Sequence, residues 1–123
     1  MGIFKSLINP IHGLIEANLQ AYFSSRVAGD NHRDALYVMV ETRYLVTRNI
    51  SPRDNDIRAL VLKELSSISE LPSVHDLKRI ISLMYVFETG RHQQPVMQRL
   101  KFYDDLDKTI EKYRQRYPSV ALN

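Results

Sequence analysis

The stretch SPRDNDIRALVLKELSSI, residues 51–68, contains the clearest helix signal in the sequence. Ser51 can cap the helix, Pro52 suits its first position, and Asp54 lies in the first turn, where the helix dipole favours a carboxylate. Apolar residues then recur at steps of three and four, which predicts a helix with one face to bury before Pro72 ends it. That face consists of Ile57, Leu60, Val61, Leu65 and Ile68.

Two similar stretches follow. Ser73 and Asp76 repeat the start signal, and Gly90 is a natural helix end. The last predicted helix begins near Pro95 and is stopped by Pro118, and its opposite face is almost wholly charged. The first of these helices is expected to bury Leu77, Ile80, Ile81, Met84 and Phe87. The second is expected to bury Val96, Leu100, Tyr103, Leu106, Ile110, Tyr113 and Tyr117.

Two helices are expected before residue 51. The first runs from about residue 10 to residue 27, with Asn9 as its cap and Gly29 as its stop. The second, from residue 31 to about residue 48, is ambiguous, because residues 35–40 are all apolar and residues 38–46 also alternate as a strand would. A length of about 18 residues favours the helix, because a single strand is usually shorter.

These patterns predict an all-α fold. A chain of 123 residues has the length of one domain, and short connections between long helices favour antiparallel neighbours. We therefore expect a single four- or five-helix up-and-down bundle over residues 10–118. Residues 1–9 are expected to form an amphipathic N-terminal arm, and residues 119–123 a frayed tail.

The composition excludes several functions. The sequence has no cysteine, so it cannot form a disulfide framework, a thiolate zinc site or a cysteine nucleophile. No apolar run is long enough to span a membrane, and Asn9, Pro10 and His12 interrupt any secretory signal. The net charge is only +3, with basic and acidic residues interleaved. We expect a soluble, cytoplasmic protein.

The N-terminal arm offers three alternatives. Gly2 and Ser6 match the pattern of N-myristoylated proteins, so the arm could bind a membrane surface. It could instead fold over the end of its own bundle, or dock on another copy of the chain. The apolar residues available for each alternative are Ile3, Phe4, Leu7 and Ile8.

Several histidines and aspartates are candidates for a metal site. His32, the pair His75-Asp76, and Asp104 or Asp107 occur in an order similar to that of HD-type metal phosphohydrolases. Here the pair opens a helix, and no glycine–lysine turn follows it, so Asp76 is expected to serve as a first-turn carboxylate. We therefore predict no metal ligands, no catalytic residues and no cofactor.

The spacing of Arg26 and His32 is similar to the arginine–histidine motif of some helical ribonucleases. In this sequence the interval contains Ala28-Gly29-Asp30, a loop that is expected to displace His32 from the first helix. We therefore predict no ribonuclease site from this pair.

The last predicted helix suggests two binding surfaces. Its tyrosines, Tyr103, Tyr113 and Tyr117, could leave hydroxyls at the bundle edge as anchors for a partner. Its basic side could contact phosphates, although Asp104 precedes Lys108 by four residues and can pair with it. The basic positions are Arg99, Lys101, Lys108, Lys112, Arg114 and Arg116.

The sequence favours a non-enzymatic interaction module, such as an adaptor, chaperone, immunity or antitoxin-like protein, that acts through protein–protein contacts. Self-association is expected as one possibility, because the arm and the second helix offer more apolar surface than a small bundle hides. A small basic nucleic-acid-binding protein and a peripheral membrane protein that uses residues 1–9 are the alternatives.

Overall fold

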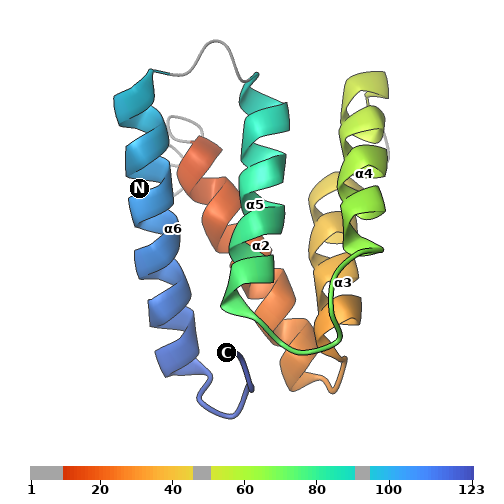
Figure 1. The fold of residues 1–123 in the computed structure, drawn as a ribbon, viewed down its shortest axis with the longest axis vertical. Helices are drawn as coiled ribbons and strands as arrows, with labels where there is room; N and C mark the ends of the chain where they lie inside the picture. Colours follow the sequence, from red (N-terminus) through yellow and green to blue (C-terminus); the bar gives the residue numbers. More distant parts are fainter. Residues whose placement is uncertain (1–9, 46–50, 91–94) are drawn as a thin grey trace.

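The computed structural model describes residues 10–45, 51–90 and 95–123. These ranges contain five helices and no strand: α2 (Pro10–Val27), α3 (His32–Leu45), α4 (Pro52–Leu65), α5 (Val74–Thr89) and α6 (Val96–Arg116). Consecutive helices alternate in direction, with α5 between α4 and α6 on one face and α2 running obliquely behind it (Figure 1). The all-α bundle predicted from the sequence is confirmed.

The helix boundaries follow the local signals. The Ser51 side chain accepts a hydrogen bond from the Asp54 amide at 3.1 Å, and Pro52 is the first residue of α4. Ser73 caps α5 in the same way through the amide of His75. Gly90 ends α5 at a φ of 75°, in the left-handed region that favours glycine.

The ambiguous second segment is a helix through Leu45, and residues 46–50 lie outside the described part of the chain. Its buried residues, Ala35, Leu36, Met39 and Val40, follow the spacing of a helix rather than of a strand. Tyr37 and Val38 project outward and are 37% and 39% exposed. The apolar run from Ala35 to Val40 is therefore only partly buried.

The core lies where α2 meets the other helices. Tyr22 and Phe23 of α2 are fully buried, and Phe23 lies 5.6 Å from the Tyr117 ring at the end of α6. Tyr85 of α5 stacks on Phe102 of α6 with 3.8 Å between ring centroids. This aromatic pair fixes the rotation of α6 about its axis.

The predicted core face of α6 is wrong in its first half. Phe102, Leu106 and Ile110 are buried, whereas Val96, Leu100 and Tyr103 are 59%, 57% and 38% exposed. The sequence contains two apolar stripes at this end of α6, offset around the helix by about one residue, or roughly 100°. The stripe that contains Phe102 is buried because it is continuous with the buried residues of the second half.

The predicted frayed tail is also corrected. The Asn123 amide donates to the Pro72 carbonyl at 3.2 Å, and the Val74 amide donates to the Asn123 carbonyl at 2.7 Å. Leu122 is only 6% exposed, and its carbonyl accepts a hydrogen bond from Arg114 at 2.9 Å. Paired backbone groups and a buried leucine hold the tail against the start of α5.

Candidate interaction surface

The outward side of α5 forms a shallow groove. The groove has a volume of about 430 Å³. Its lining changes along the helix from basic to apolar. The basic end contains His75, Lys78 and Arg79, and the remaining lining consists of Ser82, Leu83 and Val86. Leu83 and Val86 are half-buried, because their inner sides pack on the core.

Helix α6 borders the apolar end of this groove. Lys78 pairs with Asp107 at 2.6 Å, which fixes the side of α6 that lies beside the groove. Leu100 and Tyr103 precede Asp107 by seven and four residues and therefore share this side. The stacking of Tyr85 on Phe102 shows that these two residues lie side by side along the antiparallel helices α5 and α6. Leu100 and Tyr103 therefore border the groove near its apolar lining.

Helix α4 borders the other side. Arg79 pairs with Glu64 at 2.5 Å, and Arg53 donates to the Glu88 carbonyl at 2.7 Å. These two contacts bracket Leu60, which shares their side of α4 and is 49% exposed. Leu60 therefore lies level with the middle of α5, across the groove from α6.

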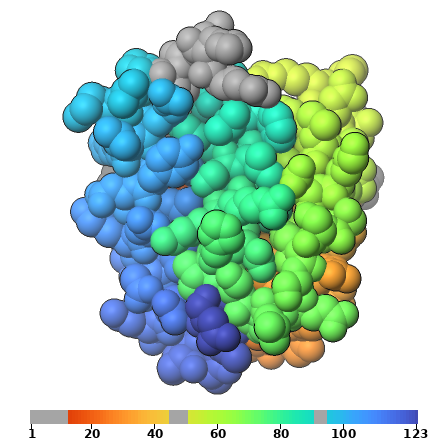
Figure 2. Space-filling model, viewed as in Figure 1, coloured from red at the N-terminus to blue at the C-terminus, as the bar shows by residue number. Residues whose placement is uncertain are grey.

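Apolar side chains of the three helices thus lie on the same side of the molecule, which we call the outer face. Figure 2 shows this side of the molecule, with α5 between α4 and α6. Two ion pairs, Lys78–Asp107 and Arg79–Glu64, lie at the basic end of the groove, beside this face. The outer face consists of Leu60, Ser82, Leu83, Val86, Val96, Leu100 and Tyr103.

The structure separates the three tyrosines suggested as partner anchors. Only Tyr103 is exposed, and it belongs to the outer face. Tyr113 is 2% exposed and donates to Glu16 at 2.9 Å. Burial, together with the Glu16 carboxylate, raises the pKa of Tyr113 to about 12. Tyr117 packs half-buried on Phe23. Tyr113 and Tyr117 therefore belong to the interior.

The suggested arm residues Ile3, Phe4, Leu7 and Ile8 lie outside the described residues. Leu83 and Leu60 were not among the suggested anchors. Their spacing within each helix is ordinary, and only the packing of α4 beside α5 brings them together.

The basic positions of α6 are partly engaged within the chain. Lys108 pairs with Asp104 at 2.8 Å, and Arg114 pairs with Glu111 at 2.9 Å. The Arg116 guanidinium lies over the Tyr113 ring. Three positions are exposed and form no ion pair with another described residue: Arg99, Lys101 and Lys112. The helix thus offers only part of its basic side to a polyanion.

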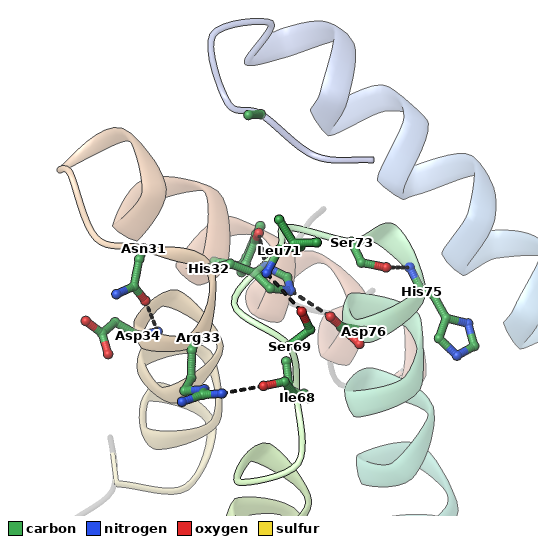
Figure 3. Close-up of polar contacts among 12 residues, drawn as sticks. Asn31, His32, Arg33, Asp34, Ile68, Ser69, Leu71, Ser73, His75 and Asp76 are labelled. Carbon is green, nitrogen blue, oxygen red and sulfur yellow. Dashed lines mark hydrogen bonds and ion pairs between the residues drawn. The ribbon is translucent and has the colours of Figure 1, made fainter.

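A buried polar network lies at the other end of the bundle from the α6 start. His32 is 1% exposed and lies 2.7 Å from the Tyr22 hydroxyl through Nδ1 and 3.0 Å from the Asp76 carboxylate through Nε2 (Figure 3 shows the contact with Asp76). Arg26 donates to the same Tyr22 hydroxyl at 2.8 Å and to the Ala121 carbonyl at 3.0 Å. The network thereby joins α2, α3, α5 and the C-terminal tail.

One set of protons satisfies this network with a neutral imidazole. Tyr22 donates its proton to Nδ1 of His32 and accepts from Arg26, while Nε2–H of His32 donates to Asp76. Burial of His32 lowers its pKa, and the bond to Asp76 only partly opposes this effect. The histidine is therefore held as a structural hydrogen-bonding group.

The histidine–aspartate set considered as a metal site does not converge. Asp76 contacts His32, but the neighbouring ring of His75 points away from both (Figure 3). Within the described ranges, no three histidine, aspartate or glutamate side chains lie close enough together to hold a metal ion. Arg26 and His32 both contact the hydroxyl of Tyr22, which joins them although a loop separates them in the sequence.

Comparison of the chain with protein-family models, curated proteins and solved structures found no match. Among the helices that the structure describes, none combines the length and the apolar character needed to cross a bilayer.

Proposed function

We propose that this protein is a helical interaction module without catalytic activity, of the adaptor, chaperone, immunity or antitoxin-like kind, and that it binds a protein through the outer face. The observation that carries the proposal is the position of apolar side chains from three neighbouring helices around one groove, exposed on α4 and α6 and half-buried on α5. Leu60, Leu83 and Leu100 come from α4, α5 and α6. Exposed apolar surface that is contiguous and rimmed by charge is typical of protein-binding sites.

The form of the groove supports a helical or flat apolar partner. Its lining extends from His75 to Val86, a rise of about 17 Å along α5, or three helical turns. Grooves of this kind accept apolar side chains spaced along one face of a partner helix. Tyr103, at the border, supplies an aromatic anchor whose hydroxyl can stay in water.

A polyanion has less support as the partner. Lys108 and Arg114 are already paired within α6. The exposed Lys101 and Lys112 stand on a different side of α6 from Leu100 and Tyr103. The two ion pairs beside the outer face, Lys78–Asp107 and Arg79–Glu64, contain as many acidic as basic side chains.

Site-specific photo-crosslinking in the cells that naturally make the chain tests this function. A photoreactive residue at Leu83 or Leu100 should give a covalent adduct of defined mass. The matched control is Val27, which is 57% exposed at the end of α2 and should give none. Equal adducts from all three positions, or no adduct from Leu83 and Leu100, would contradict the proposal.

A further inference from the structure

We infer that His32 is a pH-sensitive switch for the C-terminal tail, residues 119–123, because a proton on its ring displaces Arg26 from the tail. The switch is independent of the outer face and of the proposed function. It is built on the hydroxyl of Tyr22, which the imidazole and Arg26 share.

With a neutral imidazole, the Tyr22 hydroxyl uses both its proton and a lone pair. It donates to Nδ1 of His32 at 2.7 Å and accepts from Arg26 at 2.8 Å. Tyr22 is fully buried, so its hydroxyl depends on these two partners. Through its other terminal nitrogen, Arg26 donates to the Ala121 carbonyl at 3.0 Å. The shared hydroxyl therefore holds Arg26 in a position from which it binds the tail.

A proton on His32 changes these roles. Both ring nitrogens of an imidazolium are donors, so Nδ1 can no longer accept the Tyr22 proton. The hydroxyl would then accept from two cations, and its own proton would have no acceptor among the partners that the described residues supply. Nε2 still donates to Asp76, whose carboxylate favours the charged ring. Arg26 is only half-buried, so it can turn to water, and it then leaves the Ala121 carbonyl.

The coupling between the proton and the tail is reciprocal. Burial of the ring lowers the pKa of His32, and the charge of Arg26 lowers it further, against the opposing effect of Asp76. Release of Arg26 removes its repulsion and frees a lone pair of the Tyr22 hydroxyl for Nδ1–H. The pKa of His32 is therefore higher when the tail is released. Docking of the tail is fully favoured above about pH 6.5 and weakens as the pH falls below it.

The charge of the ring is governed by Arg26 and Asp76. The tail itself carries no ionisable side chain. The other ionisable side chains of the adjoining segments are bound elsewhere, exposed or turned away from the ring: Asp30, Arg33, Asp34, Glu70 and His75. A pH dependence of tail docking above about pH 5 therefore points to His32.

Amide hydrogen exchange of the full chain tests the switch at about pH 7.5 and about pH 5, on either side of the ordinary pKa of histidine. Protection factors remove the intrinsic pH dependence of exchange. The Asn123 amide, bonded to Pro72, and the Val74 amide, bonded to the Asn123 carbonyl, report on docking. Both should lose protection by about tenfold at the lower pH, as the uptake of one proton allows. Ile81, within α5, should stay more protected than Asn123 at both pH values, because release of the tail leaves the bundle folded.

Histidine variants identify the source of the change. His32→Gln can still accept from Tyr22 and donate to Asp76, but it takes up no proton. Its Asn123 amide should therefore have the same protection at both pH values. His75→Gln is the matched control and should lose protection at Asn123 as the unmodified chain does.

Arg26→Ala tests the connection to the tail separately, at a half-buried side chain whose truncation leaves the core intact even if His32→Gln does not fold. It removes the donor to Ala121, so protection at Asn123 should already be low at the higher pH and should change little at the lower one. A tenfold change that persists in either variant would overturn the switch. An unmodified chain with equal protection at the two pH values, or with Asn123 exchanging only as fast as Ile81, would overturn it as well.

Discussion

His32, the first residue of α3, donates a hydrogen bond from Nε2 to the Asp76 carboxylate in the first turn of α5 at 3.0 Å. Asp76 therefore accepts a hydrogen bond from a residue far away in the sequence, and it also interacts favourably with the dipole of its own helix. The contact is part of a buried network, so the protonation of His32 is coupled to folding.

The lowered pKa of His32 predicts a pH dependence of stability. The unfolded chain binds a proton to His32 below about pH 6.5, whereas the folded chain resists it, because burial disfavours the charged ring. The free energy of unfolding should therefore be fully developed above about pH 6.5 and should decrease as the pH falls toward the folded-state pKa. Chemical denaturation at a series of pH values measures this slope.

The control for this slope is a pair of histidine variants. His32→Gln should flatten the slope above about pH 5, where few carboxylates titrate. The exposed His75→Gln should leave it as in the unmodified chain. A slope that is identical in His32→Gln would show that His32 is not its source.

Tyr22→Phe removes the hydroxyl that joins Arg26 to His32. The ring still fills its fully buried site, but a buried nitrogen of His32 loses its partner. The free energy of unfolding should decrease by about 1–3 kcal/mol. Tyr103→Phe, on the exposed side of α6, should change it by less than about 0.5 kcal/mol. Urea denaturation of the two variants gives the comparison, and equal effects would contradict the buried network.

The rotation of α6 predicts a large loss of stability at one apolar residue and a small loss at another two positions away. Phe102→Ala removes a ring that is 1% exposed and stacked on Tyr85, so it should cost about 3–5 kcal/mol. Leu100→Ala, at a side chain that is 57% exposed, should cost less than about 1 kcal/mol in the monomer. Thermal and chemical unfolding at low concentration distinguish them. If Leu100→Ala were the more destabilising variant, Leu100 rather than Phe102 would face the core, as expected from the sequence.

The docked tail predicts that the last residues contribute to stability. Leu122→Ala should lower the free energy of unfolding by about 2 kcal/mol, because a nearly buried leucine is truncated. The exposed Ser119→Ala should have no measurable effect. Amide hydrogen exchange should also show protection at Asn123, whose N–H is bonded to Pro72. An unprotected Asn123 amide would indicate a frayed end.

Local signals made the helices predictable from the sequence. Ser51, Pro52 and Gly90 act through atoms a few residues away, so α4 begins and α5 ends where expected. The tail was not predictable in this way, because Asn123 bonds to Pro72 and Val74, which only the tertiary fold brings near. The core face of α6 was not predictable for the same reason. Whether Leu100 or Phe102 is buried depends on a contact with Tyr85 of another helix.

The candidate site could be predicted from the sequence less well than the fold. Tyr103 was suggested and lies on the outer face, whereas Tyr113 and Tyr117 were suggested with it and pack inside. Leu60 was expected on the buried face of its helix but is 49% exposed, and Leu83 was assigned to no face. They become neighbours on one surface only because the packing of the core places α4 beside α5.

The most direct test of the interaction module is photo-crosslinking of the chain in the cells that naturally make it, with the photoreactive residue placed in turn at Leu83, Leu100 and Val38. The account predicts an adduct of defined mass from Leu83 and from Leu100, and none from Val38 of α3, which is 39% exposed. An adduct from Val38 alone, or no adduct from Leu83 and Leu100, would contradict binding through the outer face.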